Sequence, residues 1–200
     1  MGRQGSYNRP KKKPGLVPPE PIRQGYDQLG PASYYEVHQA DYRNPHEGVI
    51  RKLLEIWFAQ WRPEQGSKVL DLACGSGEIT SFFQASGFYE IEGIDPFTGP
   101  AYLQRTGLTA APHDFSAIAE GVLKDRTYDL IFCSFALHLA ERSRLPMVCL
   151  RMSEIASDLI VLTPHKRPEI REEWGWSMIQ EWLQDRVRLR HYRKSGGNGF

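Results

Sequence analysis

The 200-residue sequence lacks several features that define specialised classes of protein. It has no apolar run near the ~20 residues of a membrane-spanning helix, and its N-terminus has no apolar signal-peptide region. Its three cysteines, Cys74, Cys133 and Cys149, show no C-x-x-C spacing, which argues against a disulfide framework or a zinc site. A net charge of +1 gives no overall attraction to nucleic acid or to anionic membranes. We therefore expect an intracellular, cytoplasmic protein without a bound metal.

Apolar residues make up 40% of the chain and charged residues 24%, as in ordinary globular proteins. Residues 1–32 are instead rich in glycine, proline and basic residues. We expect them to form a disordered tail before a single domain over residues 33–200. The tail contains the run Lys11, Lys12 and Lys13. A nuclear signal, a nucleic-acid contact and a solubilising role stay open for this run.

The stretch Val69–Glu78 has the order of a nucleotide-binding turn. An apolar strand leads into a turn with Gly75 and Gly77, and the turn opens a helix. Glycine lets the backbone approach a ligand closely, and the N–H groups at the helix start favour an anionic group. However, Asp71 at the strand end suits a ligand with a positive charge, and Thr80 replaces the third glycine of the dinucleotide pattern. Both departures argue against NAD and FAD.

A second acid follows the next predicted strand, Tyr89–Ile94. Asp95 comes after the glycines at about the 20-residue spacing of the acid that binds ribose hydroxyls. A carboxylate suits this task because it can accept a hydrogen bond from each of two neighbouring hydroxyls. The alternative is a surface aspartate that caps a turn.

The pattern Asp71-x-x-x-Gly75-x-Gly77 after an apolar strand, followed by Asp95, resembles the motifs of class I S-adenosylmethionine (SAM)-dependent methyltransferases. The resemblance extends over about Tyr34–Tyr192. It implies an α/β fold: a doubly wound, Rossmann-like, mostly parallel sheet with helices on both faces. It also implies SAM as the cofactor and in-line transfer of its methyl group to an acceptor.

The same resemblance assigns further residues to the cofactor site: Ala73, Cys74, Pro96, Phe97, Asp114, Phe115, Ser134, Tyr35 and Arg43. It implies that Asp114 accepts a hydrogen bond from the adenine amino group. A role for Asp114 as the cap of a short helix stays open. Tyr35 and Arg43 belong to the segment before a predicted helix near residues 46–61, and they either line the site or only help to pack that helix.

Two histidines follow the predicted central strands, Thr127–Ser134 and Leu159–Leu162. By the resemblance, the stretch after the first of these strands faces the acceptor, although it lacks the N/D-P-P-Y tetrad of many amine methyltransferases. His138 lies there and is a candidate general base, since neutral imidazole is available near pH 7. His165 is the second candidate, in a basic loop with Lys166 and Arg167 that could hold an acidic or phosphorylated acceptor. Structural and solvated roles stay open for these residues.

The C-terminal part departs from the family pattern. We predict a helix over Glu173–Gln184 and a short strand near Val187–Leu189, so that strand seven is missing. The turn signal Gly196–Gly199 has no strand after it. We therefore expect an absent strand, a truncated chain or a partner chain that completes the sheet edge.

Together these features predict a SAM-dependent methyltransferase with an unidentified acceptor. A small molecule is slightly favoured over RNA or protein, because the net charge is near zero and no basic stripe lies outside the tail. The first alternative is a non-catalytic protein of the same fold that acts as an assembly partner. The second, an NAD-dependent oxidoreductase, is disfavoured by Asp71 and Thr80.

Overall fold

The computed structural model of the protein describes residues 43–196. The predicted tail over residues 1–32, its lysine run and the predicted site residue Tyr35 therefore lie outside the described residues. No helix in the described range is long and apolar enough to cross a lipid bilayer.

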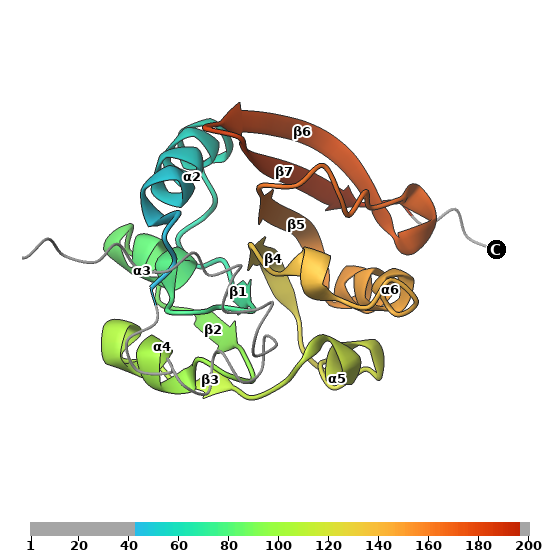
Figure 1. The fold of residues 1–200 in the computed structure, drawn as a ribbon, viewed down its shortest axis with the longest axis horizontal. Coiled ribbons are helices and arrows are strands. Elements are labelled where there is room, and N and C mark those ends of the chain that lie inside the picture. The colour runs from blue at the N-terminus through green and yellow to red at the C-terminus, as the bar shows by residue number, and fades with distance from the viewer. Residues whose placement is uncertain (1–42, 197–200) are drawn as a thin grey trace, which may run out of the picture. The chain divides into compact units, whose positions relative to one another are not determined.

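A seven-stranded sheet with the order β3-β2-β1-β4-β5-β7-β6 forms the centre of this part of the chain (Figure 1). Its strands are β1 (Val69–Leu72), β2 (Ile91–Ile94), β3 (Ala110–Ala111), β4 (Tyr128–Ser134), β5 (Ala156–Thr163), β6 (Trp176–Gln184) and β7 (Val187–Lys194). β1 to β5 pair in parallel, whereas β7 pairs antiparallel with β5 and with β6. The order reverses at β1, which pairs with both β2 and β4, and open α/β sheets bind ligands at such a switch point.

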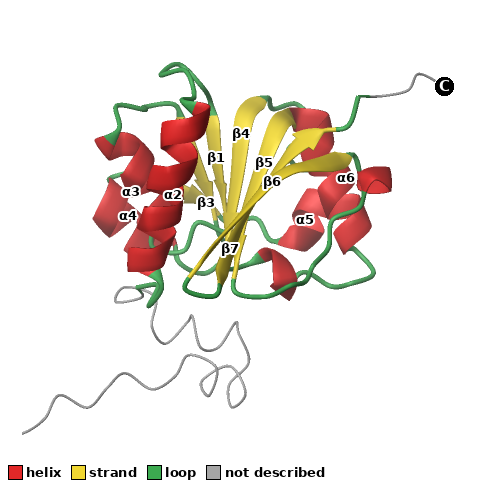
Figure 2. Ribbon diagram, turned by 90° about the horizontal axis from the view of Figure 1, so that it is seen from above, coloured by secondary structure: helices red, strands yellow, loops and turns green. Residues whose placement is uncertain are grey.

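Helices cover both faces of the sheet, with α2, α3 and α4 on one side and α5 and α6 on the other (Figure 2). With two short 3-10 turns, these elements are α2 (Glu47–Trp61), α3 (Glu78–Ala85), α4 (Gly99–Thr106), α5 (Phe115–Ala119), η1 (Leu137–Leu139), α6 (Leu145–Ile155) and η2 (Glu172–Trp174). The predicted doubly wound α/β architecture is therefore confirmed.

Apolar spacing in the sequence explains how α2 and β4 form. The inner stripe of α2 consists of Ile50, Leu53, Leu54 and Trp57, which are buried at helical spacing. They pack with α3 against one face of the sheet. In β4, every residue of Leu130–Cys133 is buried, as expected for a central parallel strand with helices on both sides. Both elements match their predicted positions closely.

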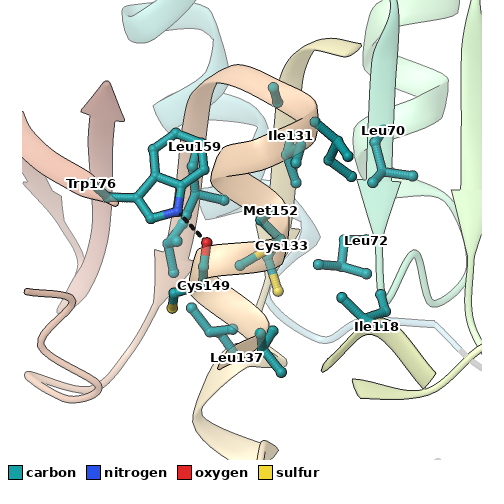
Figure 3. Close-up of a cluster of buried hydrophobic side chains, with 14 of the residues drawn as sticks. Leu70, Leu72, Ile118, Ile131, Cys133, Leu137, Cys149, Met152, Leu159 and Trp176 are labelled. Atoms are coloured by element: carbon teal, nitrogen blue, oxygen red, sulfur yellow. Dashed lines mark hydrogen bonds between the residues drawn. The ribbon is translucent and has the colours of Figure 1, made fainter. Parts of the chain in front are cut away.

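α6 closes the opposite face of the sheet. In Figure 3, Cys149 and Met152 of α6 lie among apolar side chains of β1, β4 and β5. Trp176 at the start of β6 belongs to the same cluster, and its indole N–H donates to the Cys149 carbonyl at 2.8 Å. This hydrogen bond ties the C-terminal strands to α6.

A buried histidine fixes α2 to the sheet. The indole N–H of Trp57 donates to Nδ1 of His191 in β7 at 3.1 Å. Nε2 of His191 lies 2.7 Å from Oδ1 of Asp158 in β5. Because an indole can only donate, Nδ1 is the acceptor and Nε2 carries the proton. The hydrogen bond between α2 and β7 therefore requires this histidine tautomer.

The prediction of a helix over Glu173–Gln184 is wrong. The chain forms a short 3-10 turn and then the nine-residue strand β6. A β-bulge between Met178 and Gln180 shifts the side-chain alternation by one residue. Trp176 therefore packs under α6, while Trp182 packs on the α2 side. In the sequence, Trp176, Ile179 and Trp182 are three positions apart, and this spacing imitates that of a helix.

The predicted absence of strand seven is also wrong, because the sheet has seven strands. β6 and β7 form a hairpin whose turn residues, Asp185 and Arg186, have φ values of 48° and 66°. Two successive positive φ angles are typical of the type I′ turns that join antiparallel strands. The expectation of a partner chain at the sheet edge depends on a missing strand, so the structure gives it no support.

Candidate functional site

The loops after β1, β2, β4 and β5 gather most of the predicted site residues at the carboxyl edge of the parallel strands. The glycine turn follows β1, Asp95 follows β2, His138 follows β4 and His165 follows β5. The predicted cofactor and acceptor residues therefore share one edge of the sheet.

Positive φ angles bend the turn between β1 and α3. Ala73, Gly75 and Gly77 have φ of 55°, 55° and 82°. A Cβ atom on Gly77 would lie 2.5 Å from the methyl carbon of Thr106 in α4. Gly77 is therefore required both by its backbone conformation and by the close approach of α4.

Cys74 anchors this turn through its backbone. Its N–H donates to the Ile94 carbonyl of β2 at 3.1 Å. Its side chain is buried against Tyr102 of α4 and Ala110 of β3. The thiol therefore belongs to the packing of α4 onto the sheet.

Asp71 of β1 is fully buried. Its Oδ2 accepts hydrogen bonds from the N–H and the hydroxyl of Thr80, at 3.1 and 2.8 Å. The Thr80 hydroxyl also lies 2.9 Å from the Tyr102 hydroxyl. Burial, only partly offset by the bonds to Thr80, raises the pKa of Asp71 to about 8. Oδ1 of Asp71 has no hydrogen-bond partner among the described residues.

Asp95 joins the glycine turn to the turn after β2. Its Oδ2 accepts from the Gly75 N–H at 3.2 Å, and its Oδ1 accepts from the N–H groups of Phe97 and Thr98 at 2.8 and 2.9 Å. A carboxylate has about four acceptor positions, so these bonds leave room for a further donor. The two motifs that are separate in the sequence are thus linked by a direct hydrogen bond.

Asp114 caps α5, since its Oδ1 accepts from the Ala117 N–H at 2.8 Å. The alternative role that the sequence left open for Asp114 is therefore present in the structure, and its contact with adenine stays a prediction. Phe115 is half-buried against the apolar cluster of α5 and α6. Pro96 and Phe97 are half-buried after β2.

Ser134 ends β4, and its hydroxyl oxygen is buried without a hydrogen-bond partner among the described residues. Most buried hydroxyls in native proteins have a partner, so this one can receive a ligand group. Arg43, at the start of the described range, is exposed.

A buried glutamate that the sequence did not reveal holds three helices together. Glu78, in the first turn of α3, accepts from Arg105 of α4 at 3.2 Å and from the Ser76 hydroxyl. Arg105 also pairs with Glu47 at the start of α2. The N–H of Asn44 lies 3.4 Å from Glu78 Oε1. The network fixes the entry to α2 beside the glycine turn.

The two predicted catalytic histidines are brought together. The ring centroids of His138 and His165 are 4.6 Å apart, with the planes inclined by 61°. Desolvation of the covered part of the His138 ring, followed by repulsion from His165, lowers the pKa of His138 to about 4. His138 is therefore neutral near pH 7, and its imidazole is a weaker base than a free one.

Arg190 of β7 supports the loop that carries His165. Its side chain is buried, and its guanidinium donates to the carbonyls of Pro168 and Lys166 at 3.1 and 2.9 Å. Its Nε donates to Glu181 of β6 at 2.7 Å. The fork of N–H groups thus holds the backbone of the loop from the sheet side.

Sequence reasoning missed Thr80, Tyr102 and Arg190. Thr80 served only as a departure from the dinucleotide pattern, although a hydroxyl in the first turn of α3 can bond back to an acid in β1. Tyr102 lies on α4, which the sequence analysis did not predict. Arg190 belongs to a strand whose pairing partner, β6, was taken for a helix.

Comparison with known proteins agrees with this geometry. The family model described as a methyltransferase domain matches residues 38–193. An uncharacterised protein of Schizosaccharomyces pombe is 34% identical over 207 residues, covering 82% of this chain and 83% of the relative. The chain therefore belongs to the methyltransferase-domain family and has the class I fold of SAM-dependent methyltransferases.

Solved structures share the fold at low identity. Magnesium protoporphyrin IX methyltransferase from Synechocystis PCC 6803, with bound SAM, is 15% identical with a TM-score of 0.59, covering 87% of this chain and 95% of that one. The N-methyltransferase NodS from Bradyrhizobium japonicum, in complex with S-adenosylhomocysteine, is 16% identical with a TM-score of 0.60, covering 86% and 98%. A putative RNA methyltransferase from Pyrococcus horikoshii has 15% identity and a TM-score of 0.62, covering 88% and 96%.

Proposed function

We propose that this protein is a methyltransferase that uses SAM to methylate a small molecule, with His138 as the general base. One observation carries the proposal. The linked pair of Gly75 and Asp95 and the pair of His138 and His165 lie at the same edge of the sheet, on the two sides of the switch point. A cofactor and an acceptor held there would meet at the end of β4.

The residues of the β1–β2 side fit SAM chemically. The turn of Ala73, Gly75 and Gly77 exposes backbone to the methionine part, and Asp95 retains an acceptor position for a ribose hydroxyl. Because Asp71 is fully buried, we assign it the role of positioning the turn through Thr80.

When bound, SAM supplies a methyl group on a sulfonium, and its transfer to the acceptor leaves S-adenosylhomocysteine. The protein's task is to align the acceptor atom and to remove its proton. His138 lies in η1, just after β4, and is neutral near pH 7, so we assign its imidazole to take that proton. Ser134 ends β4 four residues before His138, and its buried, unpartnered hydroxyl is free to bond a ligand group there.

The similar solved structures do not single out an acceptor, because they are described as a magnesium protoporphyrin IX methyltransferase, an N-methyltransferase and a putative RNA methyltransferase. A small molecule is supported by the net charge of +1, since an RNA-binding protein usually carries an extended basic surface.

Calorimetric titration with SAM, S-adenosylhomocysteine and NADH tests the proposal. We expect heat from the first two and none from NADH. Gly75→Val should abolish binding, because a β-branched residue at φ 55° is strongly disfavoured. Gly48→Ala is the control, since its Cβ would meet nothing within 4 Å on α2. A parent protein that binds neither SAM nor S-adenosylhomocysteine would instead support the non-catalytic alternative.

Transfer of tritium from methyl-labelled SAM to the metabolite, RNA and protein fractions of a cell extract tests the acceptor class. Label in the metabolite fraction supports a small-molecule acceptor. Label confined to RNA or protein contradicts it.

A further inference from the structure

The loop between β5 and η2, residues 164–170, is the most basic feature of the acceptor side. His165, Lys166 and Arg167 follow one another in it, and all three are exposed. Glu169 is its single acid. The stretch after β4 that brings His138 to this loop, residues 135–140, contains no acid at all. With two cations, Lys166 and Arg167, against one acid, Glu169, the loop has a formal charge of +1.

Lys166 and Arg167 are not engaged in ion pairs, whereas the two arginines of β7 that follow the hairpin turn are. Arg188 and Arg190 of β7 both pair with Glu181, at 3.5 and 2.7 Å. No salt bridge within residues 43–196 involves Lys166 or Arg167. Two unpaired cations therefore lie next to each other in the loop that contacts His138.

The loop is also held in a fixed shape. The buried Arg190 donates to the carbonyls on both sides of Arg167, those of Lys166 and Pro168. The N–H of His165 donates to the Thr163 hydroxyl at 3.1 Å. A loop that only carried solvated charges would not need a buried guanidinium beneath it. Fixing the backbone lowers the entropy cost of holding a ligand with the exposed side chains.

We propose that the methyl acceptor carries an anionic group, a carboxylate or a phosphate, which binds to His165, Lys166 and Arg167 while the accepting atom lies beside His138. This proposal rests on the proposed methyltransferase function. The patch spans one loop, and the flanking Arg188 and Arg190 are both engaged with Glu181, so it suits a single anionic group and not a nucleic acid strand.

An anion in this position also suits the chemistry of His138. Repulsion from His165 contributes to the low pKa of His138, and a neighbouring negative charge acts in the opposite direction. A bound carboxylate or phosphate would raise the pKa of His138 towards neutrality, where a general base is most effective.

Direct binding provides the first test. Pyrophosphate and malonate are titrated separately into the full chain with saturating S-adenosylhomocysteine, and binding is followed by calorimetry and by the ring signals of the histidines in NMR spectra. We expect one of the two anions to bind and to shift the signals of His138 and His165. The tighter anion identifies a phosphate or a carboxylate acceptor.

A charge-matched pair of variants makes the test specific. Lys166→Ser with Arg167→Ser should weaken anion binding at least tenfold, because charge-assisted hydrogen bonds are lost. Lys52→Ser with Lys124→Ser removes the same charge from exposed positions elsewhere and should leave binding within twofold. An equal loss in both double variants, or no binding of either anion to the parent, would overturn the proposal.

The product of methyl transfer provides the second test. Labelled product from the metabolite fraction should be retained on an anion-exchange column. Label in the unretained fraction, or in RNA or protein only, contradicts an anionic small-molecule acceptor. If SAM itself fails to bind, the proposed function fails, and the anion titration still decides whether the loop is an anion site.

Discussion

The two halves of the site edge differ in how they use their polar side chains. On the side of β1 and β2, the carboxylates are bonded to the protein itself: Asp71 to Thr80, Asp95 to three N–H groups and Glu78 to Arg105. On the side of β4 and β5, His138, His165 and the basic loop are exposed, and support comes from beneath, through Arg190. The first half is a rigid frame and the second presents its side chains outward.

This difference explains why the sequence predicts the first half of the site better than the second. A frame that holds one particular cofactor needs glycines with positive φ and acids at fixed spacing, and both can be recognised in a sequence. Side chains that meet an acceptor need only the correct charge and position, and many sequences can provide these. The following changes separate the two halves by experiment.

His138→Ala should have the largest effect, and only on the acceptor half. Loss of a general base lowers kcat by roughly 10²–10⁴-fold. The rate is measured as tritium transfer to the active extract fraction. Affinity for S-adenosylhomocysteine, measured by calorimetry, should stay within twofold of the parent, since His138 is exposed. A rate within threefold of the parent would exclude His138 as the base.

Gly77→Ala should disrupt the frame. Its Cβ would approach Thr106 to 2.5 Å at φ 82°. Strain of the left-handed backbone and overpacking together cost about 2–4 kcal/mol of unfolding free energy. Urea denaturation measures this loss. Gly48→Ala is the matched control, and it should be neutral or stabilise α2 slightly. Equal stability of the two variants would show that α4 does not pack on the turn as described.

Asp95→Ala should weaken SAM binding about 100-fold, because hydrogen bonds to a charged acceptor contribute about 1.5–3 kcal/mol each. The bonds to Gly75, Phe97 and Thr98 would be lost as well. Calorimetry compares this variant with Asp95→Asn, which keeps one acceptor oxygen and should lose less. If Asp95→Ala keeps the parent's affinity for SAM, Asp95 does not bind the cofactor.

Asp71→Asn should change the pH dependence of stability. Burial raises the pKa of Asp71 from 3.8 to about 8, so between these values the folded protein keeps a proton that the unfolded chain releases. Stability therefore falls as pH rises through this window, by at most about 1.4 kcal/mol per pH unit from this group. Urea denaturation between pH 5.5 and pH 8 should give a flatter profile for the variant. Identical slopes for variant and parent would contradict a protonated Asp71.

β6 shows where sequence reasoning reaches its limit. The segment has large apolar residues three positions apart, and this pattern predicts a helix when it is read locally. The chain instead pairs with β7 and bulges between Met178 and Gln180, so that Trp176 and Trp182 enter opposite clusters. A bulge is stabilised by the partner strand, and that information is not local. By contrast, the apolar spacing within α2 fits a helix and not a strand, and the sequence predicted the bounds of that helix closely.

The sequence alone determined the class I fold, the strand–turn–helix around Gly75 and Gly77 and the acid after β2, because backbone sterics and strand spacing restrict these features to few residue types. It also identified both histidines as separate candidates. Only the tertiary structure decided that His138 and His165 face each other, that Arg190 supports the basic loop and that a seventh strand completes the sheet. These relations join residues from different strands, and their positions follow from pairing and packing across the whole sheet.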